Sequence, residues 1–186
     1  MTAIIWILFS TTYSSATIRI GAVRSMSIIL FYGASLSLSL SLLIIAMLMR
    51  NPRLMLHSYP KDVRAAVAPK TPAELRESAC WTTVFLVLLL AFPTAAAVAS
   101  KTADGSFVEV AATAFGVVFL FNLTDWLVLD WLIFCTITPT FAVLPGTAGM
   151  AGYKDYGMHV RGFLIGSMLS AGLSLVIAAG VLASPV

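Results

Sequence analysis

Four long apolar runs constrain this chain more than any other feature. Each run is long enough for a helix that crosses a bilayer, which takes about 20 residues. The alternating Ser-Leu stretch at 35–42 is expected to be helical as well, because an isolated strand cannot satisfy its backbone in lipid. The expected spans are 27–49, 79–99, 108–133 and 161–183. The sequence therefore predicts an all-α protein, a membrane-embedded bundle of four transmembrane helices.

Composition supports a membrane protein. Of the 186 residues, 60% are hydrophobic and 10% are charged, whereas soluble domains carry about 25% charged residues. The net charge of +3 is small and no basic stripe alternates with aromatic residues, which argues against nucleic acid as a partner. Cys80 and Cys135 form neither a CxxC pair nor a zinc spacing, and we expect reduced thiols. The lipid bilayer is the expected partner, no metal site is predicted, and the cofactor stays unknown.

The first 25 residues do not fit the four-span pattern. They contain a short apolar stretch without a preceding basic residue, which suits neither a signal peptide nor a span. We expect residues 1–25 to be a poorly ordered or interfacial extension, and residues 26–186 to form a single four-helix domain. Met26 resembles an ordinary start, so whether 1–25 belong to the native protein stays open.

The basic residues predict an orientation. With four spans, one side of the membrane receives Arg50, Arg53, Lys61, Arg64, Lys70, Arg76, Lys154 and Arg161, and the other side receives Arg19, Arg24 and Lys101. Cytosolic loops carry the excess of lysine and arginine. Loops 50–78 and 134–160 are therefore predicted to be cytosolic and both termini outside, in a multi-pass protein of the cell membrane.

Asp125 and Asp130 stand out near the end of the third span. A carboxylate at the centre of a membrane helix costs roughly 2.5–3.5 kcal/mol on insertion scales, so it is usually paired or used. On a helix, Asn122 and these two residues fall within an arc of about 140° at 100° per residue. This pattern predicts a polar site that opens toward the cytosolic face. The alternative is that Asp130 is interfacial and solvated while Asp125 pairs with a basic residue of a neighbouring segment.

The connection between the third and fourth spans is apolar but cannot form a regular helix. It contains Pro139, Pro145, Gly146, Gly149, Gly152 and Gly157. We expect this irregular segment either to dock against the protein or to re-enter the edge of the bilayer, and it would then form a lid over the acidic site. It leads into a polar cluster in which Lys154 or Arg161 would neutralise the aspartates and His159 would shuttle protons or join a metal. An interfacial anchor explains the cluster equally. The candidate polar site comprises Asn122, Asp125, Asp130, Lys154, Asp155, His159 and Arg161.

Small residues recur every four positions along the fourth span. They are Gly162, Gly166, Ser170, Ser174 and Ala178. Such a stripe lets another helix approach closely. The partner is either a helix of the same bundle or a second copy, and we expect a homo-oligomer or a membrane partner subunit.

Four stretches, at 51–63, 125–131, 145–150 and 153–162, together resemble a family of small multi-pass integral membrane proteins that has no established activity. The resemblance covers about residues 51–166. It implies the fold class and no chemistry.

Three functions fit these observations. The first is a small transporter-like or ion- or proton-coupled subunit that uses Asp125. The second is a membrane-embedded enzyme that acts on a lipid-like substrate from the cytosolic side with Asp125, Asp130 and His159. The third is a structural or assembly subunit that works through the small-residue stripe. The absence of internal repeats argues against a complete secondary transporter in one copy.

Overall fold

The computed structural model describes residues 2–102 and 105–184, with side chains from Gly21 onward. The elements in chain order are α1 (Thr2–Arg50), η1 (Pro52–Ser58), α2 (Lys61–Ala65), α3 (Pro72–Ser100), α4 (Phe107–Thr124), η2 (Asp125–Ile137), η3 (Thr140–Ala142), η4 (Ala151–Lys154) and α5 (Tyr156–Ala183). Every regular element in the described part of the chain is helical, which confirms the all-α fold class.

Four helices are long and apolar enough to cross a membrane. They are Gly21–Arg50, Pro72–Ser100, Phe107–Ile137 and Tyr156–Ala183. The four-helix bundle is therefore confirmed. The third helical run ends at Ile137 rather than near 133, and this places Asp130 seven residues before the helix end instead of at it.

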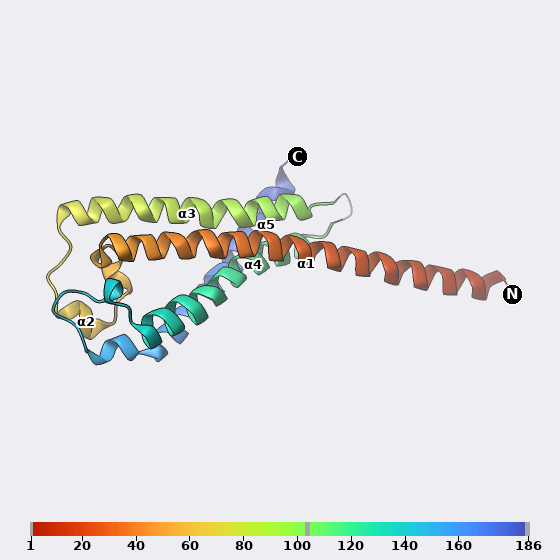
Figure 1. The fold of residues 1–186 in the computed structure, drawn as a ribbon. Coiled ribbons are helices and arrows are strands. Elements are labelled where there is room, and N and C mark those ends of the chain that lie inside the picture. Colours follow the sequence, from red (N-terminus) through yellow and green to blue (C-terminus); the bar gives the residue numbers. More distant parts are fainter. Residues whose placement is uncertain (1, 103–104, 185–186) are drawn as a thin grey trace.

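The bundle has two different ends. Figure 1 shows α1 and α3 lying side by side, with α4 and α5 crossing them obliquely. The connections at 51–71 and 138–155 lie together at one end, and the end of α3, the start of α4 and the end of α5 lie at the other. At this second end, Ala97, Ala114 and Ala178 are fully buried in a small core. Lys101 also donates hydrogen bonds to the carbonyls of Val181 (3.1 Å) and Ser184 (2.9 Å), which ties α3 to α5.

Helices α3 and α4 both begin with a capping box, a pattern that the sequence already shows as Thr71-Pro-Ala-Glu74 and Ser106-Phe-Val-Glu109. Thr71 Oγ1 accepts a hydrogen bond from the Glu74 amide, and the Glu74 carboxylate accepts one from the Thr71 amide. Ser106 and Glu109 repeat this pattern at α4. Each box satisfies amides that the helix leaves unpaired, which is worth about 1 kcal/mol.

The small-residue stripe of α5 faces largely into the bundle. A Cβ atom built at Gly166 would lie 2.6 Å from Asn122 Oδ1 of α4. Ser170, Ser174 and Ala178 are buried. Gly162 differs, because a Cβ there would meet nothing within 4 Å. Within one copy, the stripe therefore packs against α4, and the expected oligomer stays a prediction.

Helix α1 includes the stretch that we expected to be an extension. Its backbone is helical from Thr2, and Figure 1 shows its first part reaching beyond the other helices. The side chains of residues 2–20 and residue 1 lie outside the described part of the chain. The expectation for residues 1–25, and the domain that would start at residue 26, stay predictions.

Candidate functional site

The two aspartates share a face because the third span changes its helical turn. From Asp125 to Ile137 the chain forms a π-helix, in which the amide of residue i+5 bonds the carbonyl of residue i and residues five apart come to lie above one another. Asp125 and Asp130 are five apart, as are Trp126 and Trp131, whose ring centroids lie 4.9 Å from each other. The α-helical arc used in the sequence argument does not apply here, and the carboxyls lie closer in angle than it implied.

The π-helix ends at Thr138, whose backbone is in the left-handed conformation and whose side chain is hydrogen-bonded to a lysine. Thr138 has φ 49° and ψ 63°, a conformation that is costly for a β-branched residue. Lys154 donates hydrogen bonds to the carbonyls of Cys135 and Thr136 and to Thr138 Oγ1. Lysine near helix C-terminal carbonyls also complements the helix dipole. Lys154 thus holds the helix end, and it does not form the ion pair with an aspartate that the sequence argument allowed.

Asp130 pairs with a histidine of α5. Asp130 Oδ2 lies 2.9 Å from His159 Nδ1, and His159 is only 7% exposed. The imidazole packs edge-on against Phe134, with ring centroids 5.5 Å apart. His159 Nε2 is buried and has no hydrogen-bond partner among the described residues. The pair therefore fixes one side of the imidazole and leaves the other without a partner.

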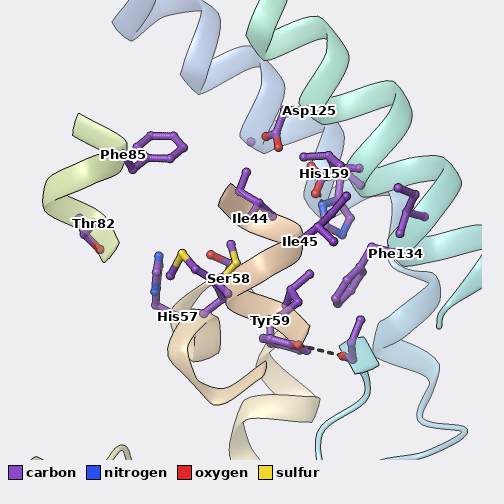
Figure 2. A pocket seen from close by; sticks show the side chains of 18 of the residues that line it. Ile44, Ile45, His57, Ser58, Tyr59, Thr82, Phe85, Asp125, Phe134 and His159 are labelled. Atoms are coloured by element: carbon purple, nitrogen blue, oxygen red, sulfur yellow. Dashed lines mark hydrogen bonds and ion pairs between the residues drawn. The ribbon is translucent and has the colours of Figure 1, made fainter. Parts of the chain in front are cut away.

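A cavity of about 570 Å³ lies beside this pair. Figure 2 shows Thr82 and Phe85 of α3 on one side, Asp125 and His159 on the other, and Ile44 of α1 between them. Its polar lining consists of His57, Ser58, Tyr59, Thr82, Asp125, Asp130 and His159. Its apolar lining consists of Ile44, Ile45, Met47, Leu48, Met55, Phe85, Leu86, Phe121, Leu129, Ile133, Phe134, Ala142, Met158 and Gly162. Its volume and apolar walls are those of a small-molecule site.

Among Asp125, Asp130 and His159, Asp125 is the residue whose side chain has no bonded partner in the described structure. Its side chain makes no hydrogen bond or ion pair to any part of the chain that the structure describes. It begins the π-helix inside the third span, 12 residues before Ile137. A carboxyl group in this setting is costly unless a proton, a cation or a ligand satisfies it.

Two loop segments are bonded to each other at the end of the bundle where the connections lie. The Tyr59 hydroxyl, which is buried, donates a hydrogen bond to the Ala142 carbonyl at 2.8 Å. The Asp62 carboxylate accepts a hydrogen bond from the Gly152 amide at 2.9 Å. The irregular connection thus docks against the loop after α1, as expected. Of residues 138–155, only Ala142 lines the cavity, so little of the connection covers the site.

The loop after α1 is itself held by charged groups. Arg53 Nε lies 2.7 Å from Glu74 Oε1, and this contact raises the pKa of Arg53. Lys70 donates to the Leu54 carbonyl and to Ser78 Oγ, and burial lowers its pKa. These contacts fix the segment that carries His57, Ser58 and Tyr59 to the cavity.

Other predicted site residues lie elsewhere. The Asn122 amide donates to the Phe163 carbonyl (3.0 Å) and to Ser167 Oγ (2.9 Å), so it joins α4 to α5. Asp155 caps the start of α5 by accepting a bond from the Met158 amide. Arg161 is exposed and does not line the cavity. Of the seven predicted residues, the structure brings Asp125, Asp130 and His159 together. Within residues 2–102 and 105–184, no three histidine, cysteine, aspartate or glutamate side chains are grouped to hold a metal ion.

Several lining residues were missed by the sequence argument. Tyr59, Thr82 and Phe85 lie 45 or more residues before Asp130 in the chain and carry no motif of their own. The π-helix did have a trace in the sequence, because the dipeptide Asp-Trp occurs twice with a spacing of five. Comparison with protein-family models, with curated proteins and with solved structures finds no match for this chain.

Proposed function

We propose that this protein is a small transporter-like membrane subunit that binds a solute in the cavity and couples this binding to a proton or cation at Asp125. One observation carries the proposal: a carboxyl group inside a membrane span faces a cavity with mostly apolar walls, and no described residue pairs with it. Ionisable residues at membrane depth commonly mark substrate and ion pathways or proton relays.

An unpaired charge at Asp125 has a high free-energy cost inside the membrane span. A carboxylate in an apolar setting is stabilised by a proton or by a cation, and exchanging one for the other changes the charge of the cavity. A solute that enters or leaves the cavity is then linked to that exchange, because each changes the free energy of the other.

The Asp130–His159 pair extends the polar path from Asp125. Its contact of 2.9 Å joins η2 to α5 next to the cavity. Histidine changes its charge near neutral pH and commonly serves as a proton shuttle. We propose that this pair exchanges protons between Asp125 and the aqueous end of the bundle.

The arrangement of the ends favours access from one side. The cavity lies between α3 and α5, which contribute Thr82 and Phe85 and Met158 and Gly162 to its lining. At the other end of these two helices, hydrogen bonds from Lys101 join α3 to α5. Most lysine and arginine residues belong to the cavity end, which we propose is cytosolic. Four spans are few for a complete transporter, so we propose that it works in the cell membrane as a homo-oligomer or with a partner subunit.

An enzyme is the second candidate, favoured by the His159 geometry. A carboxylate that fixes one imidazole nitrogen and leaves the other available is the arrangement of a general base. In that case His159→Asn would abolish turnover of a lipid-like substrate and leave its binding unchanged. The transporter proposal instead expects Asp125 to control binding itself.

Reconstituted vesicles with an internal pH dye test the proposal. Wild-type protein is expected to move protons when a panel of small solutes is added outside, and Asp125→Asn is expected to abolish this response. Equal proton movement in Asp125→Asn and wild type would contradict the proposal.

Two glycines of α5 supply a matched pair of controls. A Cβ meets nothing within 4 Å at either Gly162 or Gly172, but only Gly162 lines the cavity. Gly162→Leu is expected to fill the cavity and abolish the response, while Gly172→Leu keeps it. If both variants behave like the wild type, the cavity is not the binding site.

A further inference from the structure

The charges around the cavity are not balanced by any basic side chain. Asp125 and Asp130 both line it, and no lysine or arginine is among the described lining residues. Lys154, which is close in sequence to His159, is used at the end of η2. Lys70, in the loop after α1, is bonded to Leu54 and Ser78. The chain therefore provides two carboxyl groups without a fixed cation to match them.

The histidines in the lining do not supply that missing charge. His159 Nδ1 is directed to Asp130, which leaves Asp125 without a partner. His57 lines the cavity, and burial, together with Lys70 and Arg64, lowers its pKa. This favours the neutral form of His57 at neutral pH. A positive group in the cavity would have to come from outside the chain.

The walls are suited to the body of an organic molecule. Four aromatic side chains line the cavity: Tyr59, Phe85, Phe121 and Phe134. Aromatic faces attract ammonium groups and pack well against apolar carbon. A bare metal cation is a poor match, because hard cations take about six or more oxygen ligands and most of this lining is carbon.

One further polar atom awaits a partner at this wall. Only 7% of the surface of His159 is exposed, and its Nε2 has no hydrogen-bond partner in the described structure. When Nδ1–H donates to Asp130, Nε2 carries the lone pair and accepts a hydrogen bond. A primary ammonium group has three N–H donors, so it has enough for both the Asp125 carboxylate and this nitrogen.

We propose that the solute recognised by this cavity is a primary amine with an apolar, aromatic or aliphatic body. This inference rests on the proposed function and names its substrate class. The ammonium group pairs with Asp125, and the body lies against Phe85, Phe134 and the α1 side chains. A neutral or anionic molecule of the same shape leaves Asp125 unpaired, and an anion is repelled by both carboxylates.

Calorimetric titration of the protein in lipid nanodiscs tests this inference with three probes of similar shape. Phenethylamine is cationic at neutral pH, phenethyl alcohol is neutral, and phenylpropionate is anionic. The wild type is expected to bind the amine at least about tenfold more tightly than the alcohol, and the anion least, since a charge-assisted contact exceeds a neutral one. Empty nanodiscs correct for partition into lipid.

Variants then locate the contact. Asp125→Asn is expected to remove the preference for the amine over the alcohol, and Asp125→Glu to restore part of it. Gly162→Leu is expected to weaken all binding, and Gly172→Leu to change none. The comparison of probes on the wild type alone tests the charge preference even where a variant does not fold.

Two results would overturn the inference. One is an alcohol or anion that binds as tightly as the amine, and the other is an amine preference that survives in Asp125→Asn. Neither result touches solute-driven proton movement in vesicles, which tests the proposed function separately. Loss of that movement with an intact amine preference would instead overturn the transport proposal and leave a binding site.

Discussion

His159 Nδ1 of α5 lies 2.9 Å from Asp130 Oδ2 of the π-helix, and this contact joins the last two membrane helices beside the cavity. The two residues are 29 positions apart in the chain, and the wide turn of η2 brings Asp125 onto the same face as Asp130. The polar part of the cavity therefore has two origins. The π-helical turn of η2 places Asp125 beside Asp130, and the contact between Asp130 and His159 joins η2 to α5.

The Asp130–His159 pair is expected to contribute to stability. His159→Ala leaves the Asp130 carboxylate without its partner, and an unsatisfied group of this kind costs about 1–3 kcal/mol. Asp130→Asn is expected to cost less, because the amide oxygen still accepts a hydrogen bond. Reversible unfolding in mild detergent measures both changes. Equal stability of wild type and His159→Ala would show that the pair does not stabilise the fold.

The approach of α5 to α4 is expected to depend on Gly166. A methyl group there would lie 2.6 Å from Asn122 Oδ1, and two hydrogen bonds to Phe163 and Ser167 hold that side chain in place. Gly166→Ala is therefore expected to destabilise the protein by about 1–3 kcal/mol. Gly172→Ala on the same helix meets open space and is expected to be neutral or slightly stabilising. A comparison of their unfolding midpoints decides this, and equal midpoints would contradict the packing.

The hydroxyl of Tyr59 is expected to hold segment 138–144 against the loop after α1. It donates to the Ala142 carbonyl in a buried contact of 2.8 Å. Tyr59→Phe keeps the ring and removes only this bond, at a cost of about 1–2 kcal/mol. Amide hydrogen exchange in segment 138–144 is expected to rise in the variant. Unchanged exchange there would show that the connection is held by other contacts.

His57 is expected to make the protein sensitive to mild acid. Burial and the nearby Lys70 and Arg64 lower the pKa of His57 from its ordinary 6.5. The unfolded chain then takes up this proton at a higher pH than the folded protein does. The free energy of unfolding therefore falls as the pH drops below about 6.5, and the loss stops growing below the folded pKa.

The substitution His57→Asn isolates this contribution from the other titrating groups. Unfolding midpoints of both proteins are measured between about pH 7.5 and pH 5. The variant is expected to lose less stability than the wild type over this interval. Identical pH profiles would mean that His57 titrates alike in the folded and unfolded chain.

The fold was largely predictable from composition and helix start patterns. The capping residues Thr71 and Ser106 and the lengths of the apolar runs depend only on local sequence, and the structure confirms them. The proximity of Asp125 and Asp130 was predicted from the 100° rotation per residue of an α-helix. In the structure it results from the wider turn of the π-helix. Only the repeated Asp-Trp dipeptide gave a local trace of the wider turn.

The rest of the site depends on contacts between distant segments. The pairing of Asp130 with His159, the role of Lys154 at the helix end and the position of Tyr59 follow from how α1, η2 and α5 pack. Periodicity along one helix gives no information about such pairings. This explains why Asn122 and Lys154 were predicted for the acidic site and instead bond α5 and the end of η2.

Thermal unfolding of the purified protein with a panel of amines, metal ions, lipids and metabolites shows whether a cationic solute binds in the cavity at Asp125. A ligand at about 100 times its dissociation constant adds about 2.7 kcal/mol of stability. We expect a cationic organic solute to stabilise the wild type and Gly172→Leu, but neither Asp125→Asn nor Gly162→Leu. A panel in which no solute shifts the unfolding of the wild type would contradict a binding site in the cavity, and so would Asp125→Asn and Gly162→Leu proteins that respond as the wild type does.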